Sequence, residues 1–104
     1  MIRHVVMFRF RNDADATQRR AVRDAIATMP GATGATEAYA IGPDLGLAEG
    51  NFDFAVVGDF ADEAAYLTYR DHPEHQRIVS EIIRPAISDR AAIQYEIPQP
   101  PKPD

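Results

Sequence analysis

A tyrosine and two histidines lie close together in the string Tyr69-x-x-His72-Pro73-x-His75. A neutral imidazole can remove a proton from a carbon atom next to a carbonyl group. A phenol can donate a hydrogen bond to the enolate oxygen that then develops. Together these side chains could carry out an enolisation or an aldol-type ring closure without a cofactor.

The chain must bend between Tyr69 and His75 if both side chains are to reach one cavity. Pro73 disfavours helical geometry at His72 and suits the first turn of a new helix. Apolar residues follow His75 at helical spacing and place it on the buried side of that helix: Ile78, Val79 and Ile82. We therefore predict that two helical pieces direct Tyr69 and His75 into one space, with His72 at the bend.

The first strand supplies a third candidate, His4. It alternates with Arg3 and Val5 and shares one face with Val6 and Phe8. We expect this face to point toward the helices, so that His4 reaches the same cavity. The predicted catalytic residues are therefore Tyr69, His75 and His4.

A purely structural role and a metal site are the alternatives for these residues. His4 and His75 could be buried histidines bonded to the backbone or to each other, and Tyr69 a core residue with its hydroxyl at the rim. Zinc needs at least three protein ligands, and Pro73 interrupts the continuous helix on which His72 and His75 would best share one. We predict no metal and no other cofactor.

The composition limits the partners. The chain has 104 residues, a formal net charge of −5 and no cysteine. Nucleic acids and anionic membranes are bound mainly by positive charge, so neither is an expected partner. The lack of cysteine excludes disulfide frameworks and thiolate metal sites. Neither a secretion signal nor a run of about 20 apolar residues is evident, so we expect a cytoplasmic protein.

Alternating and helical patterns predict the order β-α-β-β-α-β. The predicted strands cover residues 2–11, 36–42, 52–60 and 90–97. The predicted helices cover residues 15–29, ended by Pro30-Gly31, and residues 62–84, broken at His72 and ended by Pro85. This order predicts a ferredoxin-like α+β fold, a four-stranded antiparallel sheet with both helices on one face. We expect one domain over residues 1–97 and a Pro-rich tail over 98–104.

The face of the sheet away from the helices should also be covered. The central residues of that face are apolar on the first and third strands: Val5, Met7, Ala55 and Val57. A solvated face would carry polar residues there. A second copy of the chain, packed sheet against sheet, is the simplest cover and predicts a homodimer. Scattered apolar surface residues are the alternative.

Several strings resemble the stress-responsive A/B barrel (Dabb) domain over about residues 1–97. They are the segment Arg3-His4-Val5-Val6-Met7-Phe8, the acidic helix start after Phe60, the Tyr69 to His75 string and the stop at Pro85. The resemblance implies a dimeric α+β barrel, in a family most of whose members have no known activity. A plant polyketide cyclase of this family, which needs no redox cofactor, uses a tyrosine and a histidine placed as Tyr69 and His75, and its first-strand histidine corresponds to His4.

The departures from that cyclase imply a pocket of different shape. The cyclase has a third-strand histidine where this chain has Phe54, and aromatic residues where it has Val22 and Ile26. Some family members hold a cation on backbone carbonyls in the stretch that matches residues 26–32. The predicted lining of the pocket is Val6, Phe8, Val22, Ile26, Phe54, Val56, Tyr66, His72, Val79 and Ile93.

Three functions remain open from the sequence. The first is a cofactor-free polyketide cyclase or isomerase that uses the Tyr69 and His75 pair. The second is a stress-responsive domain that binds a small apolar ligand or has a structural role. The third is a cofactor-free monooxygenase, by analogy with antibiotic-biosynthesis monooxygenases of the same architecture.

Overall fold

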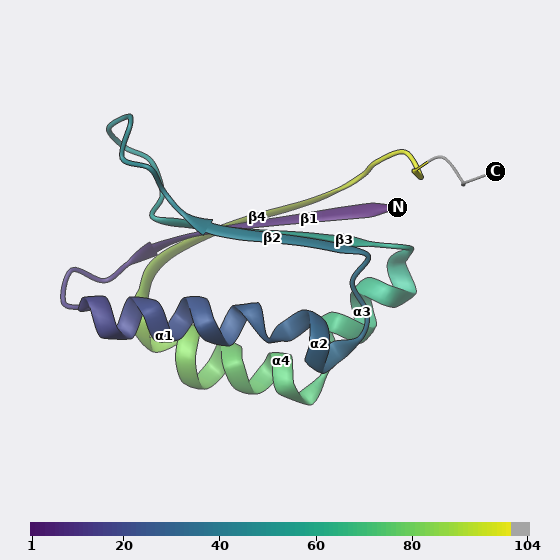
Figure 1. Ribbon diagram of the computed structural model, residues 1–104, viewed down its shortest axis with the longest axis horizontal. Helices are drawn as coiled ribbons and strands as arrows, with labels where there is room; N and C mark the ends of the chain where they lie inside the picture. The colour runs from purple at the N-terminus through teal and green to yellow at the C-terminus, as the bar shows by residue number, and fades with distance from the viewer. Residues whose placement is uncertain (101–104) are drawn as a thin grey trace.

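Four strands form a single antiparallel sheet in the computed structural model, which describes residues 1–100. The strands are β1 (Ile2–Phe10), β2 (Ala38–Pro43), β3 (Phe54–Phe60) and β4 (Ile87–Glu96), in the spatial order β2-β3-β1-β4. All helices lie on one face of this sheet, which we call the inner face (Figure 1). The ferredoxin-like α+β prediction is confirmed.

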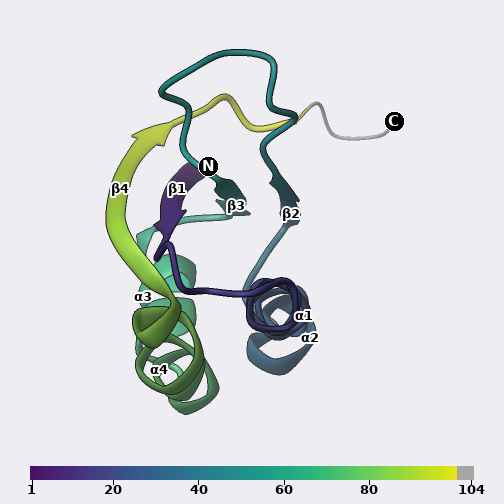
Figure 2. The same cartoon turned by 90° about the vertical axis from the view of Figure 1, so that its left-hand side faces the viewer.

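Two groups of helices pack side by side under the inner face (Figure 2). The first consists of α1 (Ala16–Ala27) and α2 (Met29–Thr33). The second consists of α3 (Glu63–Asp71), α4 (Pro73–Ile78), a π-helical segment (Val79–Ile83) and a 3-10 turn (Arg84–Ala86). The chain bends between α3 and α4 at His72, whose backbone is extended (φ −61°, ψ 134°), as the proline after it requires.

The predicted end of the first helix at Pro30-Gly31 is wrong. Pro30 instead lies in the first turn of α2, where a missing N–H breaks no intrahelical hydrogen bond. The first helix, α1, ends at Ala27. The second, α2, ends at Gly34, whose φ of 64° lies in the left-handed region that glycine adopts without strain. The consequence is that α2 carries the buried Met29 beneath the sheet.

Other boundaries also differ from the sequence pattern: β2 covers Ala38–Pro43 and not residues 36–42, and β3 begins at Phe54 and not at residue 52. The last strand begins at Ile87 and not at residue 90, because it pairs with β1 along the whole length of that strand, from Ile2 opposite Glu96 to Phe10 opposite Ile87. The helix predicted to run from Pro73 to about Arg84 is α-helical only to Ile78 and continues as the π-helical segment Val79–Ile83. π-helical turns occur often at functional sites.

The hydrophobic core lies between the inner face and the helices. Its largest fully buried side chains are Phe60, Ile26, Met29, Ile78 and Val22. The ring of Phe60 meets Tyr66 edge to face at 5.5 Å between centroids and lies 5.0 Å from the ring of Tyr69. This aromatic contact holds α3 against β3 and thereby sets the position of Tyr69.

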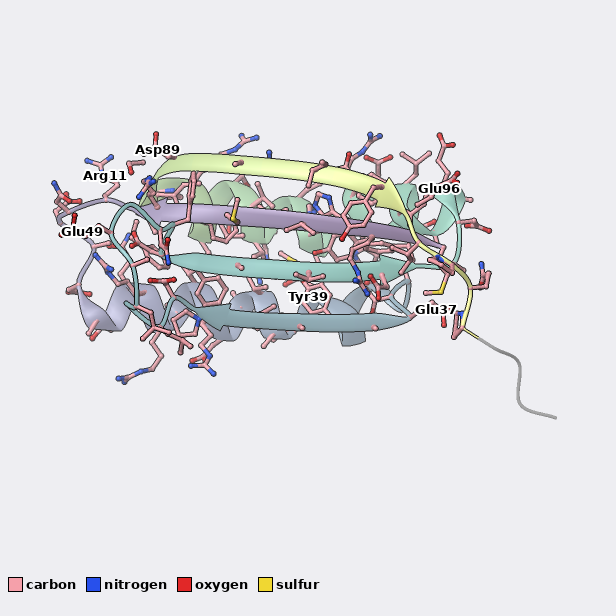
Figure 3. All side chains as sticks on the ribbon, turned by 90° about the horizontal axis from the view of Figure 1, so that it is seen from above. Arg11, Glu37, Tyr39, Glu49, Asp89 and Glu96 are labelled. Carbon is pink, nitrogen blue, oxygen red and sulfur yellow. The ribbon has the colours of Figure 1, made fainter. Side chains whose placement is uncertain are left out.

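The other face of the sheet, the outer face, is apolar in its middle. Val5 lies between Val57 and Ile93, and Met7 lies between Ala55 and Ala91 on the neighbouring strands. Charged side chains labelled in Figure 3 lie toward the ends of this face. Arg3 donates two hydrogen bonds to Asp59, at 2.8 and 3.0 Å, and holds the pKa of that carboxyl below its usual range.

No helix within residues 1–100 is long and apolar enough to cross a membrane. The last four residues of the predicted Pro-rich tail lie outside the described residues.

The start of α3 provides a test of the local structure that positions Tyr69. Asp62 accepts a hydrogen bond from the backbone N–H of Ala65 at 2.8 Å and caps the helix. We predict that Asp62→Ala lowers the free energy of unfolding by about 1 kcal/mol. Asp62→Ser, which keeps a capping oxygen, should retain most of the stability that Asp62→Ala loses. Urea unfolding at one fixed protein concentration measures the difference, and equal losses in both variants would contradict the capping role.

Candidate functional site

A cavity of about 360 Å³ lies between the inner face and the helices. Tyr69, His75 and His4 all contribute to its wall. Six residues of the predicted lining also lie on it: Val6, Phe8, Ile26, Val56, Tyr66 and Val79. A small molecule fits a cavity of this size.

Tyr69 and His75 face each other across the bend between α3 and α4. Their ring centroids are 4.6 Å apart at an interplanar angle of 59°. Tyr69 is only 3 % exposed, and His75 is half-buried. The phenol and the imidazole are therefore close enough to act on one small substrate.

The surroundings of His75 favour the neutral form of its imidazole. Burial lowers its pKa, as does the charge of Arg90, and the backbone carbonyl of Arg70 opposes these effects. Its Nδ1 is buried and has no hydrogen-bond partner within residues 1–100. A buried polar atom without a partner is uncommon, and a catalytic role is one of its explanations.

The hydroxyl of Tyr69 belongs to a pair of phenols. It lies 2.8 Å from the hydroxyl of Tyr39 and 3.2 Å from the sulfur of Met29. One hydroxyl proton lies between the two oxygens, so the other has only a thioether sulfur to bond, which is a weak acceptor. Burial raises the pKa of both phenols, so both stay protonated donors at neutral pH.

His4 completes the polar part of the cavity. Its side chain is 6 % exposed, its ring centroid lies 5.2 Å from that of Tyr66, and its Nδ1 lies 2.6 Å from the amide nitrogen of Gln94. Burial, aided by the charges of Arg90 and His75, lowers the pKa of His4 to about 4. A neutral ring that accepts from Gln94 on Nδ1 carries its proton on Nε2.

A family model, the stress responsive A/B barrel domain (Dabb), matches residues 2–97. The chain belongs to the Dabb family. No curated protein matches its sequence. Among solved structures, a dimeric ferredoxin-like protein of unknown function from Thermobifida fusca is 41% identical with a TM-score of 0.85, and the match covers 92% of this chain and 90% of that one.

Two more distant structures share the fold. A Dabb family protein from Mesorhizobium loti is 27% identical with a TM-score of 0.75, covering 95% of this chain and 97% of that one. A hydroxynitrile lyase from Passiflora edulis is 19% identical with a TM-score of 0.83, covering 97% of this chain and 96% of that one. At 19% identity, the likeness to the lyase shows a shared fold alone.

Four predicted lining residues lie elsewhere in this Dabb domain. Val22 is fully buried in the core, and Phe54 stacks on Phe8 at 6.2 Å without reaching the cavity wall. The Nδ1 of His72 accepts from the backbone N–H of Glu74 and caps α4. Ile93 pairs with Val5 on the outer face and is 59 % exposed, because the alternation of β4 turns it away from the helices.

Several lining residues escaped the sequence reasoning: Met29, Tyr39, Arg70, Ile83, Arg84, Ile87 and Arg90. Tyr39 follows no motif, and its position depends on Gly58, which lies opposite it on β3. A Cβ atom at Gly58 would come within 3.3 Å of the Tyr39 ring, so the glycine leaves room for that ring on the inner face. In the sequence, only the alternation that places Tyr39 and Ile41 on one face of a strand could have indicated that Tyr39 points toward the helices.

No group of three or more His, Cys, Asp or Glu side chains within residues 1–100 could hold a metal ion. A cation on the backbone carbonyls of residues 26–32 stays a prediction from the family resemblance.

The burial of His4 makes stability depend on pH. Its folded pKa of about 4 lies below the ordinary 6.5, so the unfolded chain binds the proton more readily, and stability falls as the pH drops from 6.5 toward 4. Between pH 7.5 and pH 4.5, we predict that the free energy of unfolding falls by about 1–2 kcal/mol more in the parental protein than in His4→Asn, after allowance for water in the cavity. Urea unfolding at the two pH values measures this, and equal losses would refute it.

Proposed function

We propose that this Dabb protein is a cofactor-independent enzyme that enolises a carbonyl compound, and so acts as an isomerase or an aldol-type cyclase. One observation carries the proposal. An imidazole whose neutral form is favoured by burial lies beside a buried phenol whose hydroxyl contacts only a second phenol and a thioether sulfur. Both groups line a cavity large enough for a small substrate.

The proposed reaction begins with proton transfer to His75. The neutral ring accepts the proton of the substrate on its unprotonated nitrogen. The electron pair of the broken C–H bond forms the enolate, whose oxygen accepts a hydrogen bond from Tyr69. Tyr39 supports this donor, because its own hydroxyl bonds the Tyr69 oxygen as negative charge develops.

The second half of the reaction returns the proton. In an isomerisation, His75 delivers it to another carbon atom of the enolate. In a cyclisation, the enolate carbon attacks a second carbonyl carbon of the same substrate, and the new alkoxide takes the proton from His75. No electrons are gained or lost, so neither reaction needs a redox cofactor. His4, neutral and on the wall of the same cavity, offers a further N–H donor to a carbonyl oxygen.

The relatives support this proposal to different degrees. The hydroxynitrile lyase indicates that the same fold can host an enzyme, although its low identity transfers no activity. The resemblance to a plant polyketide cyclase stays a prediction from the sequence. Binding of a small apolar ligand without chemistry is the alternative, and proton exchange distinguishes the two.

Proton exchange can be measured with a simple ketone in place of the natural substrate. The protein is incubated with phenylacetone in D₂O, and loss of the signal of the protons next to the carbonyl is followed by NMR. We expect exchange above the buffer rate, reduced about 10²–10⁴-fold in His75→Gln, which removes the base. Tyr69→Phe should lose about 10²-fold, since it removes the donor to the enolate oxygen.

His72→Asn is the matched control. His72 is outside the cavity wall, and asparagine keeps an oxygen that can cap α4, so exchange should stay near the parental rate. Parental exchange no faster than buffer for phenylacetone and for a panel of β-diketones would contradict the enzyme and favour a binding role.

We also propose that two copies of the chain pair through the outer face. Val5, Met7, Ala55, Val57 and Ile93 form an apolar middle on that face, with Ile93 59 % exposed and Met7 37 % exposed in the single chain. The 41% identical protein from Thermobifida fusca is described as dimeric. The segment between β2 and β3 rises above this face, where it could contact a partner (Figure 1).

The dimer proposal is tested by charge insertion. We expect Val57→Asp and Met7→Asp to yield monomer or insoluble protein, because each would bury a carboxylate in an apolar interface. Ala64→Asp, on the exposed side of α3, is the control and should leave the association unchanged. Sedimentation velocity measures the species. A stable dimer in both outer-face variants would exclude this interface.

We propose that residues 1–97 form the whole of the folded unit, in keeping with the match of the Dabb model to residues 2–97. The cytoplasmic location stays a prediction from the sequence.

A further inference from the structure

The wall of the cavity is basic although the chain as a whole is acidic. The sequence has 16 acidic and 11 basic residues. None of the acidic side chains within residues 1–100 lines the cavity, whereas Arg70, Arg84 and Arg90 do. These three arginines are also exposed, so they lie where the cavity meets solvent. The opening of the cavity therefore carries positive charge.

Two of these arginines have no acidic partner in the described part of the chain. Arg70 donates to both carboxylate oxygens of Asp71, at 2.8 and 3.1 Å, which compensates its charge. Neither Arg84 nor Arg90 forms an ion pair within residues 1–100. Their guanidinium groups are therefore available to a ligand.

The positions of the two free arginines link them to the reacting groups. Arg90 lies on β4 opposite Phe8, whose side chain lines the cavity. Arg84 begins the 3-10 turn that joins the π-helical segment to β4. The charge of Arg90 lowers the pKa of both His4 and His75, so its field reaches both histidines of the cavity.

We propose that the cavity takes a small carboxylate, whose charged group binds Arg84 and Arg90 while its carbonyl end reaches Tyr69 and His75. The chemistry at the carbonyl end rests on the proposed function, whereas recognition of the charge does not. A guanidinium group presents paired N–H donors that match the two oxygens of a carboxylate. Apolar side chains of β1 and β3, including Val6 and Val56, would surround the middle of such a molecule.

A pair of probes that differ only in charge tests this recognition. We use 4-oxo-4-phenylbutanoate, which has an enolisable ketone, and its neutral amide, and measure both dissociation constants by isothermal titration calorimetry. The acid should bind about tenfold more tightly than the amide, as expected for a charge-assisted hydrogen-bonded pair. In the double variant Arg84→Gln/Arg90→Gln the two constants should become about equal. A preference that survives the double substitution overturns the proposal.

A second double variant controls for net charge. Arg20→Gln/Arg23→Gln removes the same charge from exposed positions of α1 outside the cavity. It should keep the preference for the acid. Loss of the preference in this variant would mean that the overall charge of the protein, and not the two cavity arginines, attracts the carboxylate, which also overturns the proposal.

The two proposals fail separately. A protein that prefers the acid to the amide, yet never exchanges the protons next to the ketone of the bound acid, supports carboxylate recognition and contradicts the enolising enzyme. A protein that exchanges the protons of phenylacetone, yet binds acid and amide equally, supports the enzyme and contradicts carboxylate recognition.

Discussion

The break at His72-Pro73 is the constraint on which the site depends. On one continuous α-helix, residues six positions apart are rotated by roughly 240° about the axis, so Tyr69 and His75 would point in different directions. Pro73 forces His72 out of helical geometry, and the chain starts a new helix in a new direction. The two rings then meet at 4.6 Å. The side chain of His72 caps the new helix and so stabilises the bend from within.

Burial prepares the protonation states that acid–base chemistry requires. The same low-polarity surroundings lower the pKa of both histidines and raise the pKa of both phenols. At neutral pH the cavity therefore combines neutral bases with protonated donors. No carboxylate lies on the described part of its wall, and although the charge of Asp71 raises the pKa of His75, burial lowers it more strongly. Arg90 acts in the same direction and adds a place for an anion.

The sheet divides the molecule into two functional surfaces. Its inner face, with Val6, Phe8 and Val56, forms one wall of the cavity. Its outer face has an apolar middle between charged ends, where Arg3 is paired with Asp59. An antiparallel sheet that is apolar on both faces needs a cover on each side. The helices cover the inner face, and in the proposed dimer a second copy of the chain covers the outer face.

The sequence by itself determined the order of the elements, the bend at Pro73 and the shared face of His4, Val6 and Phe8, because periodicity and proline geometry act over a few residues. It misplaced the end of the first helix, since proline at Pro30 stops one helix and starts another equally well. Only the tertiary structure decided which distant side chains meet. Helix packing brings Tyr39 into contact with Tyr69 and Met29, and strand register places Ile93 on the outer face. The same two factors bring Arg84 and Arg90 to one cavity. No local sequence pattern records either factor.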